Sequence, residues 1–240
     1  MKKLGIIGLG LIGGSMAIDL KRKGFASQVL GVDNDPVNAA AAEKIGLVDR
    51  VVSLEECVDQ SDVIIVAVPV DAAVKLLTVV LDRFEQTGAK DKLVMDVCST
   101  KENLSLSVKY HSKRKMYVAS HPMSGTEYSG PWAALPGLFD GSACIICDPQ
   151  ESDNKAVRVV EELYTTLNMR ITYMNSSNHD VHTAYVSHVS HVISFALAQT
   201  VLEKEKDEKQ PKAQKPAGPK KTAVPATPGS YHEVTDETVD

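Results

Sequence analysis

Short apolar runs alternate along the chain with amphipathic segments of helical length. The first three are an apolar run at 4–7, an amphipathic segment at 12–23 and an apolar run at 29–32, an order typical of a βαβ unit. Several apolar runs lack polar alternation, as expected for strands covered on both faces of a parallel sheet. The pattern predicts an α/β fold with a doubly wound, mostly parallel sheet. It places further strands at 63–68, 93–96, 117–120, 144–147 and 171–173, and further helices at 72–84 and 155–167.

After the last predicted strand the pattern becomes that of one long helix, from about 179 to 205. The polar side chains of residues 175–178 can cap its start. At about 100° per residue, one side of this helix carries an apolar stripe that another surface has to cover. Its members are Val181, Ala184, Tyr185, His188, Val192, Phe195, Ala196 and Leu202.

Beyond Gln210 the chain is rich in Pro, Lys, Ala and Thr, a composition that favours disorder over a packed core. We therefore expect three parts: a sheet domain at 1–174, a helical segment at 175–210 and a disordered tail at 211–240.

Composition and charge narrow the class of protein. With 240 residues, 43% of them apolar and 24% charged, the chain can bury a sizeable core, and we expect a soluble, cytoplasmic protein. Glycines interrupt the apolar stretch near the N-terminus, which suits no signal sequence, and no apolar run is long enough to cross a membrane. A net charge of −5 argues against nucleic acid and favours a small-molecule partner.

The four cysteines are expected to be free thiols in a reducing compartment. Cys144 and Cys147 form a lone CxxC within a predicted strand, where side chains three positions apart point to opposite faces of the sheet. The second pair that would indicate a redox or metal site is absent from the sequence. We therefore assign neither role to these cysteines.

The sequence Gly8-Leu-Gly10-Leu-Ile-Gly13 is a GxGxxG motif that follows the first predicted strand and opens the first predicted helix. Gly8 permits a tight turn, Gly10 lets a pyrophosphate approach the backbone, and Gly13 allows the helix to pack closely. The carboxylate of Asp33, at the end of the second strand, can accept hydrogen bonds from a ribose 2′-hydroxyl. This is the arrangement of a Rossmann domain that binds a dinucleotide, and a glycine-rich turn without a ligand is the alternative.

We expect the dinucleotide to be NAD rather than NADP. Asp33 would repel a 2′-phosphate, and the three residues after it offer no cation. Val68 and Pro69 end the predicted strand at 63–68 and would lie near the adenosine or the nicotinamide ribose. The expected cofactor-binding residues are Gly8, Gly10, Ile12, Gly13, Asp33, Val68 and Pro69.

Ligands of doubly wound sheets bind outside the carboxyl ends of the strands. Two polar segments directly follow predicted strands: Asp96-Val-Cys-Ser-Thr-Lys101 and Ser120-His-Pro-Met-Ser-Gly-Thr-Glu127. A third polar set, Ser187-His-Val-Ser-His191, lies on the predicted long helix. We expect the substrate to lie among these segments.

In combination, these motifs resemble those of the prephenate and arogenate dehydrogenases, NAD(P)-linked enzymes of tyrosine biosynthesis, across residues 1 to about 210. The glycine motif, the segments at 96–101, 121–127 and 187–191, and His179-Asp180 occur in the family's order and approximate spacing. The resemblance implies NAD-dependent oxidative decarboxylation of prephenate to 4-hydroxyphenylpyruvate, in an enzyme that is a homodimer in the family. Arogenate, which differs in a side-chain amino group, is the rival substrate.

The resemblance also implies roles for individual residues. His121 matches the histidine that accepts the proton of the substrate's C4 hydroxyl, and Ser99 matches the serine that assists at the hydroxyl and the nicotinamide. The oxidation requires such a base, and an imidazole titrates near the working pH. Glu127 matches a residue at the pocket entrance, and His191 matches one that faces the substrate. Loop capping is the alternative role for His121 and Ser99.

The remaining histidines of the long helix suggest no further chemistry. His188 lies on the apolar stripe, and we interpret it as a buried structural residue. His179, His182, His188 and His191 would suit zinc only with a cysteine or carboxylate set that completes a defined geometry, so we expect no metal.

Family members continue past the long helix with further helices that build the dimer, cover the active site and supply an arginine for the substrate's carboxylate. Here the segment after Gln210 is Pro-rich and contains no arginine. The resemblance therefore predicts a truncated all-helical segment, weak substrate binding and turnover below that of longer family members, with NAD binding kept. A catalytically silent NAD-binding protein is the alternative from another functional class.

Overall fold

The computed structural model describes the backbone of residues 1–209 and the side chains of residues 1–186, 189–190 and 192–204. The predicted tail at 211–240 lies outside the described residues. The chain divides into two compact units, Met1–Ile193 and the residues from Ser194 onward. The first unit thus includes the start of the helical segment, and the domain boundary expected at 174 stays a prediction.

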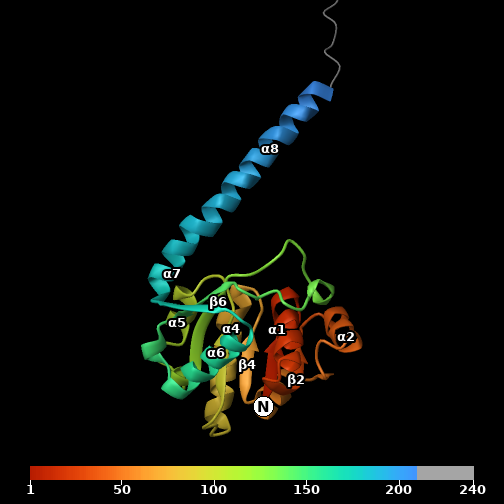
Figure 1. Ribbon diagram of the computed structural model, residues 1–240. Helices are drawn as coiled ribbons and strands as arrows, with labels where there is room; N and C mark the ends of the chain where they lie inside the picture. The colour runs from red at the N-terminus through yellow and green to blue at the C-terminus, as the bar shows by residue number, and fades with distance from the viewer. Residues whose placement is uncertain (210–240) are drawn as a thin grey trace, which may run out of the picture. The chain divides into compact units, whose positions relative to one another are not determined.

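Among the described residues, the first unit is built on an eight-stranded sheet with the order β3-β2-β1-β4-β5-β6-β7-β8 (Figure 1). The strand pairs are parallel except for β6 with β7, which is antiparallel. This confirms the doubly wound, mostly parallel sheet. The strands are β1 (Lys2–Ile7), β2 (Ala26–Val32), β3 (Arg50–Val51), β4 (Val63–Val66), β5 (Leu93–Asp96), β6 (Tyr117–Pro122), β7 (Ala143–Cys147) and β8 (Arg170–Met174).

Helices cover both faces of the sheet (Figure 1). One buried cluster joins the sheet to α1, α2 and α6, and a second cluster joins it to α3, α4 and α5. The helices are α1 (Leu11–Arg22), α2 (Pro36–Lys44), α3 (Leu54–Gln60), α4 (Val70–Gln86), α5 (Glu102–Ser107), α6 (Asn154–Thr166), α7 (Ser176–Thr183) and α8 (Val189–Lys209), with a π-helical turn at Ala184–His188 between the last two.

The hydrophobic pattern missed the short elements β3, α2, α3 and α5. These helices bury few side chains, only Ala39 and Ala42 in the case of α2, so they carry too little periodicity to be recognised. The strand expected at 63–68 was too long, because β4 ends at Val66 and Pro69 is already the N-cap residue of α4.

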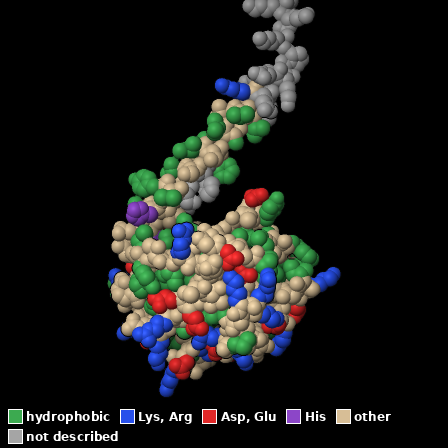
Figure 2. Space-filling view, viewed as in Figure 1, with side chains coloured by type: hydrophobic (Ala, Val, Ile, Leu, Met, Phe, Trp, Pro, Cys, Tyr) green, Lys and Arg blue, Asp and Glu red, His purple; other side chains and the backbone are tan. Residues whose placement is uncertain are grey.

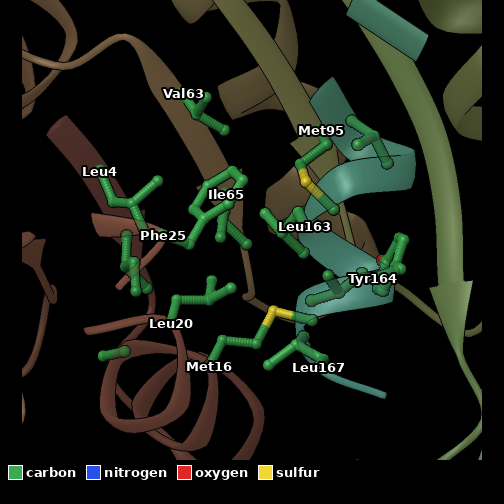
Figure 3. Close-up of a cluster of buried hydrophobic side chains, with 14 of the residues drawn as sticks. Leu4, Met16, Leu20, Phe25, Val63, Ile65, Met95, Leu163, Tyr164 and Leu167 are labelled. Carbon is green, nitrogen blue, oxygen red and sulfur yellow. The ribbon is translucent and has the colours of Figure 1, made fainter. Parts of the chain in front are cut away.

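The larger core lies on the face covered by α1 and α6. Leu4 and Ile65 of the sheet belong to one cluster with Met16 and Leu20 of α1 and Leu163 of α6 (Figure 3). This packing holds α1 against β1 and β4.

The two cysteines of the CxxC lie in different cores. Cys144 belongs to the cluster on the α1 and α6 face, and Cys147 belongs to the cluster on the opposite face, which confirms the strand geometry expected for the pair. Both thiols are free and buried, and burial raises the pKa of each to about 12. At neutral pH both therefore remain protonated, which disfavours the thiolate that redox or metal chemistry needs.

The long helical segment begins earlier than its pattern predicted. α7 starts at Ser176, where the side-chain oxygen of Asn175 accepts the backbone N–H of Asn178 at 2.7 Å. The predicted capping is thus confirmed, and helical backbone continues to Lys209. Where it is described, the predicted apolar stripe is exposed except at the half-buried Ala184, with exposed fractions of 74% at Phe195 and 57% at Leu202.

The surface of the described residues carries mixed charge. On the face shown in Figure 2, Lys and Arg side chains of the first unit lie among Asp and Glu side chains, and hydrophobic side chains follow the length of α8. No helix among the described residues combines the length and the apolar content that crossing a bilayer requires.

Candidate functional site

The glycine motif forms a turn in which each glycine meets a different constraint. Gly8 has a φ of +99°, and a Cβ there would lie 2.3 Å from the carbonyl oxygen of Ala67. A Cβ at Gly13 would lie 2.1 Å from the carbonyl oxygen of Gly8. At Gly10, in contrast, the nearest atom is the backbone nitrogen of Gly130 at 4.0 Å. The turn is thus closed around Gly8 and Gly13 and open above Gly10.

The start of α1 suits an anionic group. Gly10 is its N-cap residue, no side chain caps it, and its first turn holds no acidic residue. Ile12 in this turn packs part of its side chain against the core. The backbone N–H groups of a first helical turn point away from the helix and carry partial positive charge. The residues present therefore fit the pyrophosphate of a dinucleotide.

Asp33 is fixed beside the glycine turn. It directly follows β2, its side chain is half-buried, and its Oδ2 accepts the backbone N–H of Leu9 at 2.9 Å. Its Oδ1 accepts the backbone N–H of Asp35 at 3.0 Å. Each carboxylate oxygen can accept a second hydrogen bond, so the group remains able to bind a hydroxyl.

Val68 lies against the same turn, whereas Pro69 is more exposed. A Cβ at Gly8 would lie 2.8 Å from Cγ1 of Val68, and the carbonyl oxygen of Val68 accepts the thiol of Cys98 at 3.5 Å. The structure thus brings the predicted cofactor residues after β1, β2 and β4 to one edge of the sheet, next to the loop that follows β5.

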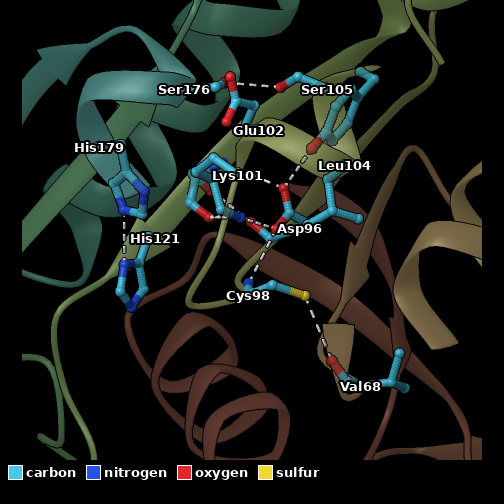
Figure 4. A network of polar contacts seen from close by, with 12 residues as sticks. Val68, Asp96, Cys98, Lys101, Glu102, Leu104, Ser105, His121, Ser176 and His179 are labelled. Atoms are coloured by element: carbon cyan, nitrogen blue, oxygen red, sulfur yellow. Dashed lines mark hydrogen bonds and ion pairs between the residues drawn. The ribbon is translucent and has the colours of Figure 1, made fainter. Parts of the chain in front are cut away.

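A buried ion pair anchors this loop. Asp96 and Lys101 contact each other through their charged groups, and both side chains are almost fully buried (Figure 4). Asp96 also accepts the hydroxyl of Tyr117 at 2.7 Å and the backbone N–H of Cys98 at 3.0 Å. The Nζ of Lys101 donates to the carbonyl oxygen of Ser120 at 2.8 Å. The pair therefore ties the loop after β5 to β6.

Ser99 lies in this loop, between the two charged residues in sequence, and is exposed. The ends of its segment are thus fixed while its own side chain faces outward. Of the segment predicted to approach a substrate, the structure buries Asp96 and Lys101 and leaves Ser99 accessible.

His121 is buried on β6 and belongs to a chain of side-chain contacts. Its Nδ1 lies 2.9 Å from Nε2 of His179, and the two rings meet edge to face with their centroids 5.1 Å apart (Figure 4). The Nδ1 of His179 lies 2.8 Å from Oδ1 of Asp180. Asp180 accepts the backbone N–H groups of Lys101 at 2.7 Å and Glu102 at 2.9 Å. The contacts join β6, α7 and the loop after β5.

Burial and hydrogen bonding together set the charge states in this chain of contacts. Burial lowers the pKa of His179 below its usual value, although the hydrogen bond to Asp180 acts in the opposite direction. Burial alone would raise the pKa of Asp180, but the N–H groups of Glu102 and Lys101 and the ring of His179 together lower it. At neutral pH a neutral His179 therefore faces an ionised Asp180.

Comparison with known proteins identifies the family. The model of the prephenate dehydrogenase nucleotide-binding domain matches residues 16–173. The chain belongs to the prephenate dehydrogenase family. The model of the prephenate dehydrogenase dimerization domain matches residues 175–221, part of which lies outside the described residues.

Two curated relatives are prephenate dehydrogenases. That of Bacillus subtilis is 30% identical over 195 residues, which cover 80% of this chain and 52% of the relative. That of Lactococcus lactis is 32% identical over 199 residues, which cover 82% of this chain and 53% of the relative. The chain thus spans about half the length of these two relatives.

Solved structures of the family share the fold. Prephenate dehydrogenase from Aquifex aeolicus, in complex with hydroxyphenyl propionate and NAD+, superimposes with a TM-score of 0.72 at 27% identity, covering 85% of this chain and 70% of that one. Arogenate dehydrogenase from Synechocystis gives a TM-score of 0.68 at 26% identity, covering 82% and 68%.

Not every residue expected at the site joins these contacts. Glu127 is exposed in the loop after β6, and within the described part of the chain no hydrogen bond links it to another candidate site residue. The side chains of His188 and His191 lie outside the described residues.

His179 and Asp180 were matched to the prephenate dehydrogenases by sequence but received no role. The contact of His179 with His121 spans 58 positions, and it depends on β7 and β8 following β6 across the sheet. The signal available in the sequence was their place in the first turns after the last strand, at the carboxyl end of the sheet.

Proposed function

We propose that this chain binds NAD and oxidises prephenate with loss of carbon dioxide, giving 4-hydroxyphenylpyruvate. Membership of the prephenate dehydrogenase family supports the reaction class. The observation that carries the proposal is the imidazole of His121, buried on β6 beside the loop of Ser99 and held at one ring nitrogen by His179. This arrangement suits a base that removes a hydroxyl proton at a fixed place.

The glycine turn and the residues around it would hold the cofactor. The first turn of α1 fits the pyrophosphate and Asp33 fits a ribose hydroxyl, since its carboxylate would repel the additional phosphate of NADP. When bound, NAD supplies the acceptor for the hydride that leaves C4 of the substrate. The proposed contacts are Gly8, Gly10, Ile12, Gly13, Asp33, Val68 and Pro69.

His121 and Ser99 would act on the substrate itself. His121 accepts the proton of the C4 hydroxyl while Ser99 donates a hydrogen bond to the same oxygen. The bond to the ring carboxylate then breaks, its electron pair enters the ring and carbon dioxide leaves. The proton returns from His121 to the oxygen as the ring becomes aromatic, so the enzyme ends the cycle in its starting protonation state.

Two further residues and the helical segment complete the proposal. Glu127 at the pocket entrance and His191 facing the substrate rest on their match to the family motifs. We infer that a second copy of the chain covers the exposed apolar side chains of α8, because the dimerization-domain model matches this region. The parts 1–174 and 175–210 would then be the NAD-binding domain and the dimer-forming segment.

An absorbance assay at the NADH band tests this function. The purified chain is mixed with NAD and prephenate, with NAD and arogenate, or with NAD alone, and each mixture is repeated with NADP. We expect NADH to form with NAD and prephenate and not without a substrate. Faster reduction with arogenate would assign the chain to that substrate, and the absence of reduction with either substrate would refute the proposed function.

The substitution Gly10→Ala tests the place of the cofactor. The new Cβ meets no atom closer than 4.0 Å and the backbone at Gly10 has an ordinary φ of −80°, so we expect the melting temperature to stay within about 2 °C. The methyl group would project toward the pyrophosphate, and we expect NADH to bind at least about tenfold more weakly, a loss of about 1.4 kcal/mol.

The control is Gly125→Ala, because a Cβ there also meets open space but lies outside the glycine turn. NADH affinity, measured by fluorescence titration, is expected to be unchanged in this variant. Equal NADH affinity in Gly10→Ala and the wild type would place the cofactor elsewhere.

A further inference from the structure

Two side chains outside the proposed substrate contacts lie in line with His121. Its Nδ1 is 2.9 Å from Nε2 of His179 (Figure 4). Nδ1 of His179 is in turn 2.8 Å from Oδ1 of Asp180. His179 is fully buried, so the partners available to its ring are those that the fold supplies. A ring nitrogen can either donate or accept, and each contact therefore fixes the direction of the next one.

We propose that Asp180 and His179 are positioning residues that hold His121 in the tautomer with its proton on Nδ1, so that the lone pair needed for proton transfer is on Nε2. The inference rests on the proposed function, in which His121 is the base, and it adds the residues that make this base ready to act.

The direction of the contacts follows from Asp180. An ionised carboxylate can only accept, so Nδ1 of His179 must donate to it. A neutral His179 then has its lone pair on Nε2 and can only accept there, which requires Nδ1 of His121 to donate. The lowered pKa values of Asp180 and His179 agree with these charge states.

Asp180 is itself fixed by two backbone donors, the N–H groups of Lys101 and Glu102. These residues begin α5 and follow the loop that carries Ser99. The same carboxylate therefore sets the orientation of the His179 ring and ties α7 to the loop of the second proposed catalytic residue.

The other titratable groups around the two rings come from neighbouring strands. Asp96, at the end of β5, raises the pKa of His179, and Lys101, in the loop after β5, lowers it. Cys144 on β7 contacts the backbone of His121 and has a raised pKa of about 12, so it stays neutral. We call Asp180, His179 and His121, joined by these two contacts, the relay. Its ionised member is Asp180, whose charge stabilises the imidazolium that forms when His121 accepts a proton.

Nuclear magnetic resonance of the full chain tests the tautomer directly. The chain is labelled with 15N-histidine, and spectra that correlate ring nitrogens with ring protons are recorded at about pH 7.5, with His121 assigned from the spectrum of His121→Asn. We expect the proton of His121 on Nδ1 in the wild type and on Nε2 in His179→Leu. Glutamine at position 179 can place its oxygen where Nε2 of the ring was, so His179→Gln should keep the proton on Nδ1.

Turnover gives the second readout. We expect kcat to fall about tenfold to hundredfold in His179→Leu and to recover at least partly in His179→Gln, while KM and NADH affinity change less than about threefold. The control His182→Leu replaces an exposed histidine of the same helix and should match the wild type in both readouts.

The two proposals fail in different ways. A wild-type His121 with its proton on Nε2, or an unchanged kcat in His179→Leu, would overturn the relay even if the chain oxidises prephenate. A wild-type chain that reduces NAD with neither substrate would overturn the proposed function, and the tautomer measurement would still decide whether the relay exists.

Discussion

Replacing His121 by asparagine is expected to lower kcat between about a hundredfold and ten-thousandfold, the range that a general base contributes. Asparagine can keep a polar atom near Nδ1 of the original ring and thus the contact with His179. It has no group at the place of Nε2 that could accept the hydroxyl proton. The substitution therefore removes the base and preserves the packing of β6 against α7 as far as one residue can.

Steady-state kinetics with prephenate and a separate NADH titration measure the two effects. NADH affinity should change less than about threefold, because His121 lies on β6 and the glycine turn lies between β1 and α1. The substitution His111→Asn is the control, since His111 lies away from the site and contacts Asp82. A His121→Asn variant that retains more than about a tenth of the wild-type kcat would show that another group takes the proton.

The sheet was predictable because its strands are apolar along their whole length. β4 and β5 are buried at every position, and their order with the intervening helices follows from the rules of βαβ units. The reversal of β7 could not be predicted, since strand direction depends on how the loop from Met123 to Ser142 returns to the sheet. The start of α7 was predicted too late in the chain, at about residue 179. Ser176 and Ser177 are polar and add nothing to the apolar pattern, although they are compatible with a helix.

The candidate site could be predicted only where the residues that form it lie close together in the sequence or on adjacent strands. The backbone roles of Gly8 and Gly13 follow from a motif of six residues, and the structure shows the tight turn and the close helix packing expected of them. The approach of a pyrophosphate at Gly10 stays a prediction. The position of Asp33 next to Leu9 follows from two adjacent parallel strands. The contact between His121 and His179 depends on tertiary structure, and the place of His179 in the first turns after the last strand is a signal that His182 shares.

Lys101 illustrates a second kind of missed residue, and its replacement by methionine is expected to destabilise the fold strongly. The Lys101 and Asp96 side chains are 0% and 1% exposed, so the ion pair is out of contact with water. Methionine keeps most of the side-chain volume and removes the positive charge, which leaves the Asp96 carboxylate buried without its counterion. Breaking a buried pair in this way typically costs about 3–5 kcal/mol.

Urea unfolding measures this loss. Lys75→Met is the matched control, because Lys75 is exposed on α4, and its free energy of unfolding should stay within about 0.5 kcal/mol of the wild type. The double substitution Asp96→Asn with Lys101→Met removes both charges and should be more stable than Lys101→Met alone. The side-chain oxygen of the new asparagine can accept the backbone N–H of Cys98, and its NH2 group can donate to the hydroxyl oxygen of Tyr117. If Lys101→Met were as stable as Lys75→Met, the ion pair would not be what holds the loop of Ser99 against β6, and the hydrogen bonds of Asp180 to the same loop would have to account for its position.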